Sequence, residues 1–237
     1  METIGKPLLV FDMDGVLVDV TESYRETIAR TVEHFTGARP TRELIQEYKN
    51  AGGWNDDWKL SHHMVQEAGV DTAFEDVKSH FQNLFHGDGE QTRAPIAGAH
   101  GLMQREQWIA QSGVLESLNA KFRFALFTGR PKWEAELTLK RFAPDLLFHP
   151  IIGMDEVENH KPAPDGLLQI LQHDQDIIYI GDTVDDARCA KSAGVRFIGI
   201  APPSNPLYID LVFLFHAENA FAIVDDINYL EEVFASS

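Results

Sequence analysis

The chain has 237 residues, of which 20 are basic and 37 acidic, so its formal net charge at pH 7 is −17. A chain this acidic is repelled by nucleic acid and by anionic membranes, which excludes both as expected partners. Its length and its 44% hydrophobic content predict one substantial core with a smaller second domain. No apolar run is long enough to span a bilayer, and Met1–Lys6 lacks the apolar stretch of a signal segment. We therefore expect a cytoplasmic protein.

The first predicted element is a strand over Leu8–Phe11, an apolar run typical of a parallel strand that is buried on both faces. It ends in Asp12 and Asp14, and Gly15 follows directly. Two ionised carboxylates this close repel each other unless a cation or a shared proton compensates them. Mg²⁺ is the usual cation, and it is commonly held by one or two carboxylates together with a substrate phosphate. This arrangement predicts Asp12 as a nucleophile toward phosphorus and Asp14 as the general acid and base. The alternative is a strand followed by an ordinary polar turn.

A helical insertion is predicted next, from Val20 to about Ala94. Apolar residues recur there at intervals of three and four, which is the period of an amphipathic helix, and glycine and proline interrupt the pattern several times. The insertion therefore differs in character from the strand-rich segments on either side of it.

The segment 49–58 of this insertion is too polar and too rich in glycine for a helix interior. Lys49, Trp54 and Asn55 offer an ammonium, an aromatic ring and an amide, which suit recognition of a small organic group that bears a phosphate. The equally weighted alternative is that Trp54 and Trp58 only anchor the start of a helix.

The next predicted strand, Phe122–Phe127, stops at Thr128, Gly129 and Arg130. A hydroxyl and a glycine amide at the end of a strand suit a phosphate oxygen, so Thr128 and Gly129 are candidate phosphate ligands. We expect Arg130 to help reverse the sign of the electrostatic field around an anionic substrate, because the chain as a whole would repel one.

Two further segments carry candidate site residues. Lys161 directly precedes a predicted helix start and can neutralise both the nucleophile and the phosphoryl group. Another buried strand, Ile177–Ile180, leads to Asp182, the expected third carboxylate of a metal site.

The single cysteine, Cys189, falls in a predicted helix and is interpreted as a buried, inert thiol. Beyond it we predict strands over Val195–Ile200 and Ala220–Val224, followed by a short helix over Leu230–Phe234.

Taken together, these motifs resemble the four signatures of the haloacid dehalogenase superfamily, in the family's order. They are Asp12-x-Asp14-Gly15, Thr128-Gly129, Lys161-Pro162 and Gly181-Asp182-x-x-x-Asp186. The resemblance covers nearly the whole chain and is closest to the subfamily IA type, which has a helical cap of the C1 kind. It implies that Asp12, the backbone carbonyl of Asp14, and Asp182 hold Mg²⁺. Asp185 and Asp186 compete for a supporting acidic role, and the family spacing favours Asp186.

The resemblance also implies an α/β fold with a doubly wound, Rossmann-like core of three layers around a parallel sheet. The core would comprise residues 1–19 and 95–237, and the cap residues 20–94. In the family a cap at this position closes over the active site, with hinges expected near 16–21 and 87–95.

The expected function is hydrolysis of a small phosphorylated metabolite by a Mg²⁺-dependent phosphatase that forms an aspartyl phosphate on Asp12. A sugar phosphomutase shares this chemistry, and a phosphonatase would need a Schiff-base lysine, for which Lys49 is the candidate. A dehalogenase is disfavoured because the family's dehalogenases lack the second aspartate, and a non-catalytic binding module would not need a nucleophile together with an acid. The sequence carries no signal for the oligomeric state.

Overall fold

The computed structural model describes residues 5–87 and 101–235 of the chain. The chain divides into two compact units, a core unit of residues 1–18 and 108–237 and a helical unit of residues 19–107. The sequence predicts these boundaries at 19/20 and at 94/95, and the second position lies outside the described residues. The short strands β2 (Val18–Asp19) and β3 (Gln107–Trp108) pair with each other where the chain passes between the units.

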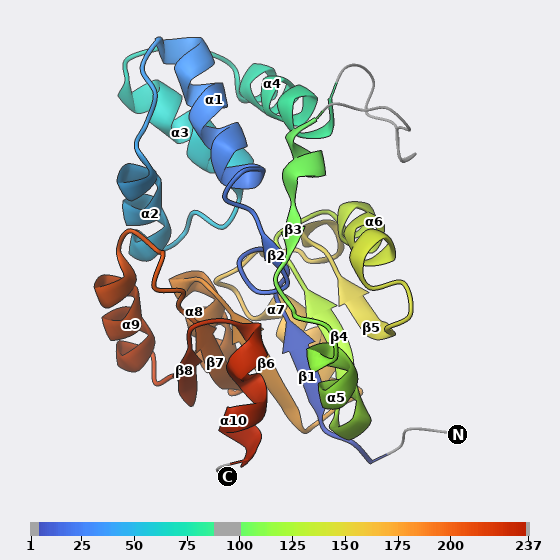
Figure 1. Ribbon diagram of the computed structural model, residues 1–237. Coiled ribbons are helices and arrows are strands. Elements are labelled where there is room, and N and C mark those ends of the chain that lie inside the picture. Colours follow the sequence, from blue (N-terminus) through green and yellow to red (C-terminus); the bar gives the residue numbers. More distant parts are fainter. Residues whose placement is uncertain (1–4, 88–100, 236–237) are drawn as a thin grey trace. The chain divides into compact units, whose positions relative to one another are not determined.

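The core unit is built on one six-stranded parallel sheet with the order β5-β4-β1-β6-β7-β8 and helices on both sides (Figure 1). This confirms the predicted doubly wound α/β fold. Strands β4 and β5 lie on one side of β1 in the sheet, and β6, β7 and β8 lie on the other side. The strand order therefore reverses at β1, and its carboxyl end is the switch point where such sheets bind ligands. The strands are β1 (Leu8–Phe11), β4 (Arg123–Phe127), β5 (Phe148–Ile152), β6 (Ile177–Gly181), β7 (Arg196–Ile200) and β8 (Ala222–Val224).

The central strands are buried because helices cover them from both sides. Every residue of β1 and of β6 is buried, and Val10, Phe127 and Tyr179 contribute to one continuous apolar cluster. Burial on both faces explains why these strands have apolar runs without alternation. The helical segments of the core unit are α5 (Val114–Lys121), α6 (Lys132–Phe142), η2 (Met154–Glu156), α7 (Asp165–Leu171), α8 (Val184–Ala193), α9 (Tyr208–Ala217), η3 (Ile227–Tyr229) and α10 (Leu230–Ala235).

Strand β5 is the strand of the six-stranded sheet that the sequence does not predict. It is an edge strand, and only its end residues, Phe148 and Ile152, are buried. Pro150 sits in its middle, where a missing backbone N–H is tolerated because one side of an edge strand has no partner strand. The edge position therefore allows a sequence pattern that does not indicate a strand.

The helical unit contains the helices that the apolar periodicity predicts. Helix α1 packs against α3 and α4, and the rings of Tyr24 and Phe85 lie 4.1 Å apart between α1 and α4. None of the helices in the described residues combines the length and hydrophobicity of a membrane span. The helical segments of this unit are α1 (Tyr24–Thr36), α2 (Arg42–Ala51), α3 (Asp57–Glu67), α4 (Phe74–His86) and η1 (Leu102–Arg105).

Cys189 lies in α8 and is buried, as the sequence predicts, with its S–H directed to the carbonyl oxygen of Ala163 at 3.2 Å. Burial raises the pKa of this thiol to about 12. This keeps the thiol protonated at pH 8, whereas the thiolate is the reactive form. We therefore expect an aromatic disulfide reagent to leave the native protein unmodified and to modify one thiol per chain in denaturant. Modification of the native protein as fast as of the unfolded chain would contradict this.

Candidate active site

Asp12 stands directly after β1, at the switch point of the sheet. Its backbone N–H donates to the carbonyl oxygen of Ile180 at 2.8 Å, so neighbouring strand β6 fixes its backbone position. The turn that follows needs a glycine, because Gly15 has φ 72° and a Cβ there would lie 2.0 Å from Oδ2 of Asp182. The glycine of the first motif therefore lets the turn after β1 approach the carboxylate that follows β6.

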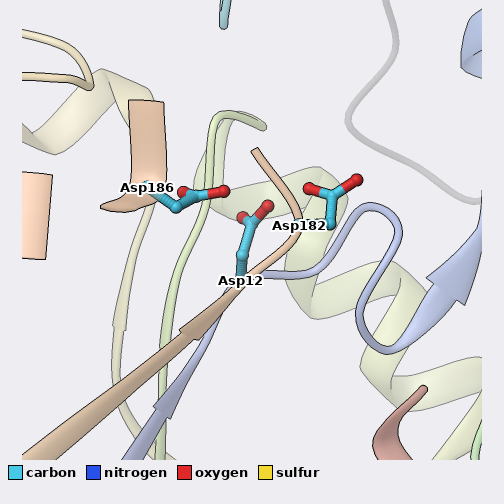
Figure 2. A group of neighbouring side chains, drawn as sticks. All are labelled: Asp12, Asp182 and Asp186. Carbon is cyan, nitrogen blue, oxygen red and sulfur yellow. The ribbon is translucent and has the colours of Figure 1, made fainter. Parts of the chain in front are cut away.

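Three carboxylates meet at this edge of the sheet. Asp12, Asp182 and Asp186 each offer an oxygen, and these oxygens lie within 4.8 Å of one another (Figure 2). They come from the end of β1, the end of β6 and the first turn of α8. The side chain of Asp14 is not a member of this group, and neither is Asp185, although Asp185 is buried. The structure thus brings together the side chains of three predicted metal-site residues, whereas the predicted contribution of Asp14 is its backbone carbonyl.

Lys161 joins two of these carboxylates. Its ammonium donates to Oδ1 of Asp12 at 2.9 Å and to Oδ1 of Asp186 at 2.8 Å, and all three side chains are buried. The ammonium also lies 4.9 Å from the ring centre of Phe127. The surrounding contacts hold Lys161 in one position, where its charge faces the predicted nucleophile.

The electrostatic balance of the site leaves Asp12 short of positive charge. Burial raises the pKa of Asp12 to about 7, even though Lys161 opposes this shift. Burial also opposes the charge of Lys161, but Asp12 and Asp186 outweigh it and raise the pKa of Lys161 above its usual value. Three carboxylates and one ammonium leave a formal charge of −2. A largely buried excess of negative charge on oxygen ligands, with Asp182 partly exposed, fits a divalent cation such as Mg²⁺.

Asp186 has a different environment from that of Asp12. Its Oδ1 accepts from Lys161 and from the hydroxyl of Tyr179 at 2.7 Å, and its Oδ2 accepts from N and Oγ1 of Thr183 at 3.0 and 2.6 Å. Burial alone would raise the pKa of Asp186, but Lys161 and the hydrogen bonds from Thr183 and Tyr179 lower it. Because both oxygens already accept two hydrogen bonds each, Asp186 suits the supporting role, in which it holds Lys161 in place.

The sequence does not single out Tyr179 or Thr183 as site residues. Thr183 carries a local signal, because a threonine three residues before an acidic residue at a helix start forms a capping box, and this one is present. Tyr179 is the one polar residue among the aliphatic side chains of β6 before Gly181. A hydroxyl in a buried strand is the feature of the sequence that could have indicated a site residue, since a buried hydroxyl needs a hydrogen-bond partner.

The segment after β4 places Thr128 and Arg130 in the core unit, and both are buried. The Thr128 hydroxyl accepts from the Arg130 amide at 3.2 Å, and among the described residues its own proton has no acceptor. A bound phosphate oxygen could take that proton. The guanidinium of Arg130 contacts Asp14, with Nε 2.8 Å from Oδ1, and Thr138, with Nη1 3.0 Å from Oγ1. Arg130 was expected to help reverse the sign of the electrostatic field around an anionic substrate, and in the structure its guanidinium contacts the predicted general acid.

The predicted recognition segment lies in the helical unit. Lys49 is buried, donates to the carbonyl oxygen of Trp54 at 2.7 Å, and forms an ion pair with Asp57. The indole of Trp54 stacks on the imidazole of His63, with ring centres 4.4 Å apart. The half-buried Asn55 side chain has no hydrogen bond to any described residue.

The start of α3 also organises this segment. Asp56 caps the helix by accepting from the backbone N–H groups of Trp58 and Lys59. The ammonium of Lys78 lies 4.5 Å from the ring centre of Trp58. Both tryptophans therefore contact other side chains of the helical unit near the start of a helix.

The fold and the four motifs match a known family. A model of the haloacid dehalogenase-like hydrolases matches residues 9–200, which include every motif at the carboxyl edge of the sheet. The chain belongs to the haloacid dehalogenase-like hydrolase family. This agrees with the order of the motifs along the sequence and with the group of carboxylates at the end of β1.

Individual known proteins are also similar to this chain over most of its length. An imidazoleglycerol-phosphate dehydratase of Phytophthora nicotianae is 32% identical over 205 residues, which cover 82% of this chain but 43% of that protein. A phosphoglycolate phosphatase of Pseudomonas putida is 24% identical over 94% of this chain and 78% of its own length. A phosphonoacetaldehyde hydrolase-like protein from Oleispira antarctica has the same fold, with a TM-score of 0.70, 17% identity, and 98% and 92% of the two chains covered.

Proposed function

We propose that this protein is a Mg²⁺-dependent phosphatase that hydrolyses small phosphomonoesters through an aspartyl phosphate on Asp12. The observation that carries the proposal is the environment of Asp12, a buried carboxylate at the switch point with Lys161 on one oxygen and the acidic group beside it. A carboxylate so placed can attack phosphorus, because Lys161 neutralises the charge that brings two anions together.

The reaction proceeds in two displacements. An oxygen of Asp12 forms a bond to phosphorus while the ester oxygen leaves, and that leaving oxygen takes a proton from Asp14. Asp14 then accepts a proton from water as the water oxygen bonds to phosphorus, and the bond between phosphorus and Asp12 breaks. In both displacements the Thr128 hydroxyl donates a hydrogen bond to a phosphoryl oxygen, and the Gly129 amide offers a second hydrogen-bond donor.

Asp12, the backbone carbonyl of Asp14, and Asp182 would hold the magnesium ion, with Asp186 as the supporting acidic residue. When bound, the ion would supply positive charge to the phosphate and to the carboxylates, which the local charge of −2 leaves uncompensated. Asp186 supports this site through Lys161, whose ammonium it holds against Asp12.

Metal binding has a readout that is independent of catalysis. Because Mg²⁺ would bind the folded chain, we expect it to raise the melting temperature. At a hundred times its dissociation constant, the ion would increase the free energy of unfolding by about 2.7 kcal/mol. Asp182→Asn is expected to lose most of this shift, whereas Asp145→Asn, an exposed control, is expected to keep it. Equal shifts in both variants, measured by differential scanning fluorimetry, would count against the site.

The helical unit is proposed to act as the cap and to supply contacts for the organic part of the substrate. Its half-buried Asn55 is the best candidate, since this amide has no hydrogen bond to a described residue. Lys49 is a weaker one, because Asp57 and the Trp54 carbonyl already occupy its ammonium. The same ion pair disfavours a phosphonatase, which would need an unprotonated lysine to form a Schiff base.

The substrate is proposed to be a small phosphorylated metabolite, and the relatives' names suggest a panel. It comprises phosphoglycolate, imidazoleglycerol phosphate, several sugar phosphates and pyrophosphate, each tested with Mg²⁺ and with a chelator. We expect metal-dependent release of phosphate from at least one ester. Transfer of phosphate between sugar positions without release would favour the phosphomutase instead, and no turnover of any compound by folded, metal-binding protein would contradict both.

A further inference from the structure

Arg130 and Asp14 form an ion pair with unusual geometry. Nε of Arg130 donates to Oδ1 of Asp14 at 2.8 Å, and Nη2 donates to the same oxygen. An arginine that pairs with both oxygens of a carboxylate is the common arrangement. Here both bonds fall on one oxygen, and no hydrogen bond from a described residue reaches Oδ2 of Asp14.

The two partners differ in how firmly they are held. The side chain of Arg130 is 1% exposed and that of Asp14 is 26% exposed. Arg130 is also fixed by its Nη1, which donates to Thr138 in α6, and by its amide, which donates to Thr128. The guanidinium is therefore a rigid donor that connects the end of β4 to the acidic side chain after β1.

We propose that Arg130 is the positioning residue for Asp14, holding Oδ1 so that Oδ2 is the oxygen that exchanges the proton in both steps. This inference rests on the proposed phosphatase function. In the first displacement, the proton on Oδ2 passes to the leaving oxygen as its bond to phosphorus breaks. In the second, Oδ2 takes a proton from the attacking water as the new bond to phosphorus forms. Arg130 keeps all its protons throughout.

A role in placing the proton donor makes a specific kinetic prediction. Alkyl phosphates have poor leaving groups that need protonation as they depart, whereas p-nitrophenolate leaves readily without it. The ratio kcat/KM reports the steps up to formation of the phosphoenzyme, so it isolates this first proton transfer. Loss of the positioning contact should therefore lower kcat/KM far more for an alkyl phosphate than for p-nitrophenyl phosphate.

The test compares the wild type with Arg130→Met, Asp14→Asn and the double variant on p-nitrophenyl phosphate and on the best alkyl ester of the panel. General acid catalysis contributes about 10²-fold or more. We expect Arg130→Met to lower kcat/KM about 100-fold for the alkyl ester and less than about 10-fold for p-nitrophenyl phosphate. We also expect the double variant to be no slower than Asp14→Asn, because the two residues act as one unit.

Two further variants keep the test decisive if Arg130→Met does not fold, as judged by circular dichroism. Thr138→Val removes one anchor of the guanidinium with little change of shape, and Arg130→Lys keeps the charge but not the planar set of donors. Both should show the same preference for the good leaving group to a smaller degree. Equal losses on the two esters, or additive losses in the double variant, would overturn the positioning role. If the wild type hydrolyses neither ester, the proposed phosphatase function itself fails and the inference falls with it.

Discussion

Asp12→Asn is expected to lower kcat for phosphate release by at least about 10⁴-fold, because an amide cannot replace the attacking carboxylate. The variant should still fold. Lys161 keeps Asp186 as its partner when Asp12 becomes neutral, so no buried ammonium is left unpaired. The decisive measurement is acid quenching after mixing with a labelled phosphoester. The wild type should retain acid-stable, protein-bound phosphate during turnover, and Asp12→Asn should retain none.

The control for this experiment is Asp145→Asn, which makes the same chemical change at an exposed position of the core unit. It should keep both turnover and the phosphoenzyme. Turnover by Asp12→Asn within tenfold of the wild type would remove Asp12 as the nucleophile. Loss of its circular dichroism signal would instead mean that Asp12 is needed for folding.

The difference in stability between Asp12→Asn and the wild type, measured in the presence of a chelator, is expected to depend on pH. Burial raises the pKa of Asp12 from 3.8 to about 7 in the folded protein. Between these two values the folded state binds more protons at this site than the unfolded state, so ionisation of Asp12 reduces stability as the pH rises. Asp12→Asn should therefore become more stable than the wild type as the pH rises from about 4 to about 7. Urea unfolding at several pH values measures this, and a difference independent of pH would contradict it.

Lys161→Met is expected to lower the free energy of unfolding by about 3–5 kcal/mol at pH 8, the usual effect of removing one partner from a buried ion pair. The substitution leaves Asp12 and Asp186 buried without their shared ammonium. Lys161 helps to hold the pKa of Asp186 low, so the substitution removes a cation that stabilises the ionised form of this carboxylate. Equilibrium unfolding in urea gives the free energy directly.

This loss should shrink in acid, because protonation neutralises the two carboxylates that Lys161→Met leaves unpaired. Lys121→Met is the matched control, since Lys121 forms an exposed ion pair with Glu231. Exposed ion pairs contribute little because solvent screens them, so the control should change stability little at any pH. A loss below about 1 kcal/mol in Lys161→Met at pH 8 would mean that Lys161 does not compensate buried charge in the folded protein.

Much of the catalytic core is predictable from local sequence alone. The apolar runs before Asp12, Thr128 and Asp182 are strands, and the polar residues follow them directly. The reason is that a strand buried on both faces must be apolar throughout, while the residues that follow its carboxyl end lie at the edge of the sheet, outside the layers of helices. The order of these motifs is also a property of the sequence, and it identifies the family. The family model that matches residues 9–200 confirms this identification.

The partners of each side chain depend on the tertiary structure. Lys161 reaches Asp12 across 149 positions of the chain, and Arg130 reaches Asp14 across 116. Such contacts depend on the strand order and on the direction in which each turn leaves the sheet. The local pattern of apolar and polar residues predicts neither. For the same reason the sequence does not assign Tyr179 to Asp186, or β5 to the sheet edge. The sequence by itself determined which residues stand at the carboxyl edge of the sheet. Only the tertiary structure decided which of them touch, because those contacts arise from packing between distant segments.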